Sequence, residues 1–207
     1  MLYGRETFLT GVCLLLLLVA APGAVSAKDA DAGAFLESLN REAHAKLADI
    51  ELSQAQKEDN FRTMFRAAFD VPAISRFVLG RYWRKASEAQ REDFINQFEE
   101  LHMRRFLPLF ADVSEKAIAV KRILPEENKP DFFKVASTVS RSEGEPISVV
   151  WRVRDIGDDY KVLDIVAEGV SMAISLRQEY SSVAKSHGIQ GLIDMMREKN
   201  VELAAQQ

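Results

Sequence analysis

Apolar residues recur at helical spacing through the first part of the chain. Between 31 and about 54 they return every three or four positions and predict one helix, and the same spacing predicts a second helix over 57–69. A short third helix is expected over 72–79, because Pro72 suits the first turn of a helix and Gly80 suits its end. Three consecutive helices therefore precede any strand.

A fourth, longer helix is predicted from 88 to about 110. Ser87 and Gln90 have the spacing of a capping box, in which each side chain bonds the backbone of the other residue. Phenylalanine, leucine and methionine residues follow at helical spacing, and Pro108 is expected to end or kink the helix.

The pattern then changes to alternation of apolar and polar residues, which is typical of half-buried strands. A first strand contains Ile118 and Val120, and turn residues at 125–130, 143–146 and 157–159 separate it from three more. The later strands are expected over 133–139, 147–154 and 160–167. Turns this short join antiparallel neighbours, since parallel strands need long crossovers.

Helical spacing returns over 172–186 and 189–199, with Gly188 between the two segments. The predicted fold is therefore α+β, with a four-stranded antiparallel sheet covered by N-terminal and C-terminal helices. Four cations at alternate strand positions indicate that the other face of the sheet is partly solvated. They are Lys134, Arg152, Arg154 and Lys161.

The first 27 residues have the pattern of a secretory signal. Arg5 precedes an apolar run over 11–21, Pro22 breaks it, and small residues lead to an expected cleavage after Ala27. A membrane anchor is the alternative, but the run is shorter than the roughly 20 residues that a span requires. Cleavage leaves a single domain over 28–207 and removes the only cysteine, Cys13, which suits a periplasmic location.

Composition excludes several classes of protein. The chain has 207 residues, a formal charge of −4 and 47% hydrophobic residues, and its mean hydropathy is −0.12. The hydropathy argues against several membrane spans, and the acidic balance argues against nucleic acid as a partner. The apolar content is sufficient for a sizeable core.

One motif could indicate catalysis. Residues 169–173, Gly-Val-Ser-Met-Ala, are close to the nucleophile elbow of serine hydrolases, with His187 and Asp164 as possible partners of Ser171. That elbow belongs to parallel sheets, however, and the predicted sheet is antiparallel. The simpler interpretation is that Ser171 caps the helix that follows it, and no catalytic residue is assigned.

No metal site is predicted either. His44, His102 and His187 are scattered over three helices without ligand spacing, and the paired acidic residues suit solvated surfaces. The residues by themselves thus indicate an exported α+β domain without enzyme chemistry or a cofactor. Whether its apolar residues form a solid core, as in a periplasmic adaptor, or surround a ligand stays open.

Three segments resemble the MlaC family in order and spacing. Residues 78–83 (VLGRYW) with 86–92 (ASEAQRE) are similar to a conserved family segment, 164–172 (DIVAEGVSM) to its signature at the junction of sheet and helix, and 185–192 (KSHGIQGL) to a third. The similarity extends over roughly 69–199. Each motif alone is modest, but three in the same order are specific.

The resemblance implies a periplasmic shuttle, known in some relatives as a toluene-tolerance or ABC-transporter auxiliary protein. Such a protein carries phospholipid between an outer-membrane lipoprotein complex and an inner-membrane ABC transporter complex and helps to maintain outer-membrane lipid asymmetry. We expect a monomer with phospholipid as cargo and no other cofactor. A sister family of similar fold makes a hopanoid the alternative cargo, and an exported serine hydrolase using Ser171 is the alternative from another class.

A carrier of this kind needs an apolar slot. Two acyl chains of ~30 carbons in total cost on the order of 20 kcal/mol to expose to water. The ten residues expected to line that slot lie on the short helix, the long helix, two strands and the start of the fifth predicted helix. They are Ile74, Val78, Phe98, Leu101, Phe106, Val149, Trp151, Ile165, Val170 and Met172.

Overall fold

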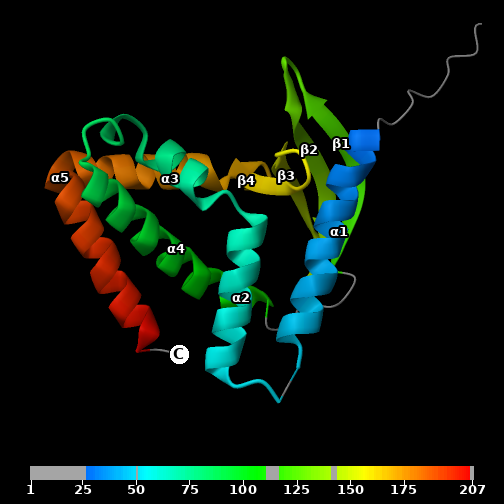
Figure 1. Ribbon diagram of the computed structural model, residues 1–207, viewed down its shortest axis with the longest axis horizontal. Coiled ribbons are helices and arrows are strands. Elements are labelled where there is room, and N and C mark those ends of the chain that lie inside the picture. Colours follow the sequence, from blue (N-terminus) through cyan, green and yellow to red (C-terminus); the bar gives the residue numbers. More distant parts are fainter. Residues whose placement is uncertain (1–26, 50, 111–116, 141–143, 206–207) are drawn as a thin grey trace, which may run out of the picture.

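The computed structural model of the protein describes residues 27–49, 51–110, 117–140 and 144–205, so all of the predicted signal over 1–27 except Ala27 lies outside it. Figure 1 shows helices on one side of a twisted sheet. In chain order the helical elements are α1 (Ala27–Leu47), α2 (Gln54–Ala68), α3 (Val71–Leu79), the 3-10 turn η1 (Gly80–Tyr82), α4 (Glu88–Phe110) and α5 (Met172–Ala204).

The sheet is an antiparallel meander in which each strand pairs with the next. Its strands are β1 (Ile118–Glu126), β2 (Lys129–Val139), β3 (Ile147–Asp155), β4 (Tyr160–Ala167) and β5 (Val170–Ser171). The predicted α+β class is confirmed. The described chain adds a two-residue fifth strand, and the turn after β1 is shorter than predicted, with Asn128 at φ 60°.

The first two helices divide differently from the prediction. α1 ends at Leu47, whereas one helix was expected to reach about residue 54. α2 begins at Gln54 because Ser53 and Gln56 form a capping box: the Ser53 side chain accepts from the Gln56 N–H, and the Gln56 side chain accepts from the Ser53 N–H.

The later helices follow the predicted signals closely. The Ser87–Gln90 capping box is present, with both hydrogen bonds at 3.2 Å, and α4 ends two residues beyond Pro108. α5 contains a sharp kink at Gly188, whose φ of 73° and ψ of 178° are not helical. Figure 1 shows the chain turning there between the two arms that the sequence predicts as separate helices.

Buried apolar residues form two clusters. The first, the helical cluster, lies among α2, α3, α4, α5 and the end of α1, which adds Ala43 and Leu47, with Phe94 and Ile193 fully buried. The second, the sheet cluster, joins Ala32 and Leu36 of α1 to the inward residues of β2, β3 and β4. Phe69 packs against both clusters, so the boundary between them passes beside its ring.

Polar contacts join the helices to the sheet where α2 meets α3. The Asp70 N–H donates to the carbonyl of Val162 on β4 at 3.1 Å, and Lys161 donates to the carbonyls of Arg66 and Ala67 at the end of α2. The Asp70 carboxylate accepts from the N–H of Ala73 at 3.0 Å, which caps α3, and pairs with Arg154 at 2.5 Å. One short segment thus fixes the position of α3 against β4.

Replacing Asp70 should separate its two roles. Asp70→Ala removes the helix cap and leaves Arg154 without its carboxylate, so we expect a loss of about 1–2 kcal/mol in the free energy of unfolding. Asp70→Asn retains a capping oxygen and should cost less. Urea denaturation measures both, with Asp158→Ala in an exposed turn as the control. Wild-type stability in both Asp70 variants would contradict this role.

Candidate functional site

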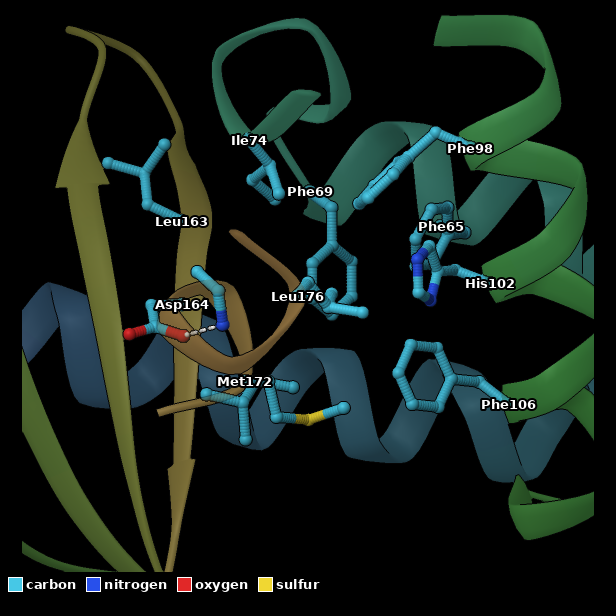
Figure 2. Close-up of a pocket in the computed structure, with 12 residues that line it drawn as sticks. Phe65, Phe69, Ile74, Phe98, His102, Phe106, Leu163, Asp164, Met172 and Leu176 are labelled. Atoms are coloured by element: carbon cyan, nitrogen blue, oxygen red, sulfur yellow. Dashed lines mark hydrogen bonds between the residues drawn. The ribbon is translucent and has the colours of Figure 1, made fainter. Parts of the chain in front are cut away.

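A small apolar cavity of about 40 Å³ lies between α4 and the sheet. Figure 2 shows α3, α4 and α5 directing side chains toward it across from β4. Most of the groups on its wall are apolar. Its lining residues are Phe65, Phe69, Ile74, Phe98, His102, Phe106, Leu163, Asp164, Ile165, Met172, Ala173 and Leu176.

A second cavity of about 40 Å³ adjoins the first. Four residues line both: Phe65, Phe69, Phe106 and Ile165. The second cavity reaches from α2 to Trp151 on β3 and Ile118 on β1. The two cavities therefore lie along the boundary between the helical and sheet clusters, separated by aromatic rings and one isoleucine.

The separating rings are packed against one another. Phe65 and Phe69 stack with their centroids 4.6 Å apart, and His102 stacks on Phe106 at 5.9 Å. Stacked or offset rings contribute about 0.5–1.5 kcal/mol per pair beyond the area that they bury. The division between the cavities is thus made of side chains, which rotate more readily than backbone moves.

His102 and Asp164 are the polar residues in the cavity wall, and His102 is the more deeply buried of the two. Its ring is 2% exposed, and its Nε2 lies 3.3 Å from the hydroxyl of Tyr180. Burial, with the nearby charge of Arg105, lowers the pKa of His102 to about 3, and burial raises the pKa of Tyr180. Both groups are therefore neutral at pH 7, and the interior carries no charge at this point.

Asp164 lies at one end of the first cavity and holds the start of α5 in place. Its carboxylate accepts from the Ser171 hydroxyl at 2.6 Å and from the Ala173 N–H at 2.9 Å. The Ser171 oxygen in turn accepts from the Ile174 N–H at 3.1 Å, so the predicted helix cap is confirmed.

The histidine predicted as a partner of Ser171 is far from it. His187 lies 16 residues further along α5, before the kink, which places it about 24 Å away at 1.5 Å per residue. The Ser171 hydroxyl donates to a carboxylate and caps a helix. Nothing in the described part of the chain assembles a triad around it.

An open groove of about 940 Å³ meets the first cavity. Ile74, Leu163, Asp164 and Ala173 line both spaces, so this is where the apolar interior reaches the surface. The outer face of the sheet contributes Lys134 and Arg152, which are direct cross-strand neighbours.

Ion pairs balance most of the charge in this groove. Arg152 binds Glu126 through two hydrogen bonds, and the bond from Arg152 lowers the pKa of Glu126. Arg154 pairs with Asp70. Lys134 projects from the exposed face beside these pairs.

The structure brings six of the ten predicted lining residues to the cavities. Ile74, Phe98 and Met172 line the first cavity, Trp151 lines the second, and Phe106 and Ile165 line both. Val78 and Leu101 are buried in the helical cluster and Val149 in the sheet cluster, while Val170 is 61% exposed. A ligand-binding role for any of the ten stays a prediction.

Other lining residues were not among the ten. Phe61, Met64, Phe65 and Phe69 come from α2 and the residue that follows it, and Leu176 comes from α5. The helical periodicity of α2 contained the signal for an inward face, but did not indicate that this face borders a cavity.

The described residues form neither a metal-binding cluster nor a membrane-spanning helix. No group of His, Cys, Asp or Glu side chains there has an arrangement that could hold a metal ion. No helix in these same residues combines the length and apolar character needed to cross a bilayer.

Because His102 is held neutral, stability should depend on pH through this residue. Below about pH 6.5 the unfolded chain protonates His102, whereas the folded protein resists protonation down to about pH 3. Acidification from pH 6.5 to 4.5 should therefore cost wild type about 2–3 kcal/mol more than His102→Phe. Denaturant titrations at several pH values test this.

His187→Gln, which removes an exposed histidine, is the control and should follow wild type. An unchanged pH dependence in His102→Phe would show that His102 is accessible to protons in the folded protein.

The chain is similar to known proteins in both sequence and fold. The MlaC protein family model matches residues 37–198. The intermembrane phospholipid transport system binding protein MlaC of Haemophilus influenzae is 27% identical over 124 residues, which are 58% of this chain and 58% of that protein. The chain thus matches less than two thirds of the length of this relative.

A solved structure supports the fold. The phospholipid-binding protein from Ralstonia solanacearum, determined in complex with a phospholipid, matches with a TM-score of 0.73 at 22% identity. The match covers 83% of this chain and 97% of that one. The family model extends from the middle of α1 nearly to the end of α5, which is further toward the N-terminus than the 69–199 expected from the three sequence motifs, and the protein belongs to the MlaC family.

Proposed function

We propose that this protein is a phospholipid carrier that binds acyl chains between its helices and its sheet. The observation that carries the proposal is the pair of adjoining apolar cavities on the boundary between the two clusters. The phospholipid bound by the Ralstonia solanacearum protein and the transport role of the Haemophilus influenzae protein support it.

The cavities as they stand are too small for this cargo. Each measures about 40 Å³, whereas pockets for drug-sized ligands measure about 300–1,000 Å³. We infer a closed state that opens along the cluster boundary. Movement there would join the two cavities and leave the packing within each cluster intact.

Rotation of Phe69 and Phe106 would start this opening, because both rings separate the cavities. Buried acyl chains then replace the ring contacts that are lost. Each buried CH₂ contributes about 0.8 kcal/mol, so a modest opening cost is readily offset.

The groove beside Ile74 and Asp164 is the proposed exit for the polar end of the lipid. Lys134 and Arg152 offer hydrogen-bond donors to a phosphate there, which a hopanoid would not use. This chemistry favours phospholipid over the hopanoid alternative. The contacts of Ser171 favour a carrier over a hydrolase.

The proposed biological setting is the periplasm. The proposal includes export by the predicted signal, with cleavage after Ala27. The exported protein would be a monomer with one domain over 28–207. The carrier would exchange lipid between an outer-membrane lipoprotein complex and an inner-membrane ABC transporter complex, and its chemistry would be binding and release alone.

Native mass spectrometry of the purified protein tests the proposal. Wild type should carry phospholipid in a monomer, identified by lipid extraction and phosphorus content. Leu176→Trp replaces an aliphatic side chain of the first cavity with a bulky ring that fills the space. This change should lower the amount of bound phospholipid severalfold, at a cost of about 1–3 kcal/mol in the free energy of unfolding.

Leu124→Trp on β1 makes the same change at a 40% exposed site and serves as the matched control. Wild-type protein free of phospholipid after exposure to phospholipid vesicles would overturn the proposal. Equal loading of the two tryptophan variants would place the acyl chains elsewhere.

A further inference from the structure

A second concave surface lies between α3, η1 and the first arm of α5. This hollow has a volume of about 440 Å³ and is distinct from the two apolar cavities. Four arginines and two aromatic rings define it: Arg76, Arg81, Arg84, Arg177, Phe77 and Trp83. We call it the arginine hollow.

Its arginines differ from the two arginines that line the open groove. Arg152 and Arg154 each pair with a carboxylate. Across the described residues, no carboxylate lies within ion-pair distance of an arginine of the hollow. The hollow therefore concentrates uncompensated positive charge on a chain whose formal charge is −4.

Contacts between its own side chains also hold the hollow in shape. The Arg177 guanidinium lies 4.9 Å from the centroid of the Phe77 ring, and Arg81 lies 4.9 Å from that of Tyr82 while donating to its hydroxyl. Gly80 has φ 56°, and a Cβ there would come within 3.2 Å of the Arg177 guanidinium. Glycine at this position thus leaves room for Arg177 beside the backbone.

The chemistry of this surface fits an acidic segment of a protein. Arginine binds carboxylates through a planar fork, and arginine and aromatic residues are enriched where proteins dock. Phe77 is 41% exposed at the centre of the charge, which is typical of an interface anchor. A concave surface accepts a projecting loop or helix end, whereas a flat bilayer would contact only its rim.

The hollow adjoins the proposed lipid exit. Ala73 and Phe77 line both the hollow and the open groove, and Ile74, next to Ala73 on α3, lines the groove and the first cavity. A partner seated in the hollow would thus contact the helix that forms one side of the exit.

We propose that the arginine hollow is the docking site for an acidic segment of the protein with which this carrier exchanges lipid. The role in exchange rests on the proposed carrier function. Binding of the acidic segment itself depends only on the hollow, so the two ideas can fail separately.

A labelled octaglutamate peptide is the probe, and fluorescence anisotropy at low salt measures its binding. Arg76→Glu/Arg84→Glu should weaken binding roughly tenfold or more, because like charges then face each other. Arg41→Glu/Arg122→Glu makes the same charge change on α1 and β1 and should stay within about twofold of wild type. Phe77→Ala keeps the charge and should also weaken binding.

Circular dichroism checks folding, and Arg76→Gln/Arg84→Gln replaces the charge-reversed variant if that variant is unfolded. Equal weakening by the hollow and control variants would overturn the proposal. Preferential, hollow-dependent binding to phosphatidylglycerol vesicles would also overturn it and identify a membrane surface as the occupant. Bound phospholipid should persist in the variants that change Arg76 and Arg84, and its absence from wild type would contradict the carrier function alone.

Discussion

The structure depends on how two apolar clusters meet. Two partly buried residues, Phe69 and Leu39, pack against both clusters. Interiors of proteins normally leave few voids larger than a water molecule. Here two adjoining cavities lie on the contact between the clusters, so packing is incomplete there.

Polar contacts limit how this boundary can move. Asp70, Lys161 and Arg154 hold the α2–α3 junction against β3 and β4, and Asp164 holds the start of α5. These contacts lie at one edge of the cavities, so opening is expected to occur away from them. The exit groove and the arginine hollow lie on α3 beside the same fixed edge, where a partner would meet an unmoving surface.

Local patterns predicted most of the fold because helix periodicity, strand alternation and turn residues act over short distances. The boundary between α1 and α2 follows from the Ser53–Gln56 capping box, which is the same kind of sequence signal as the Ser87–Gln90 capping box. A strand as short as β5 has no periodicity to detect. The lining of the cavities is harder to predict from the sequence. Strand alternation places Val149 and Trp151 on one face of the sheet but does not indicate that, of the two, only Trp151 borders a cavity. That difference arises from packing against α2, which is distant in sequence.

Bound lipid is proposed to separate the two clusters. Residues 28–207 contain no cysteine, so a pair of cysteines can be introduced there and spin-labelled without a competing site. Exposed Lys121 on β1 and Glu92 on α4 are the two positions. Pulsed electron resonance with and without phospholipid measures the distance between sheet and helices, and a Glu92–Glu198 pair measures it within the helices. The account predicts a longer sheet-to-helix distance and an unchanged helix-to-helix distance in the loaded protein. Bound phospholipid with both distances unchanged would contradict it.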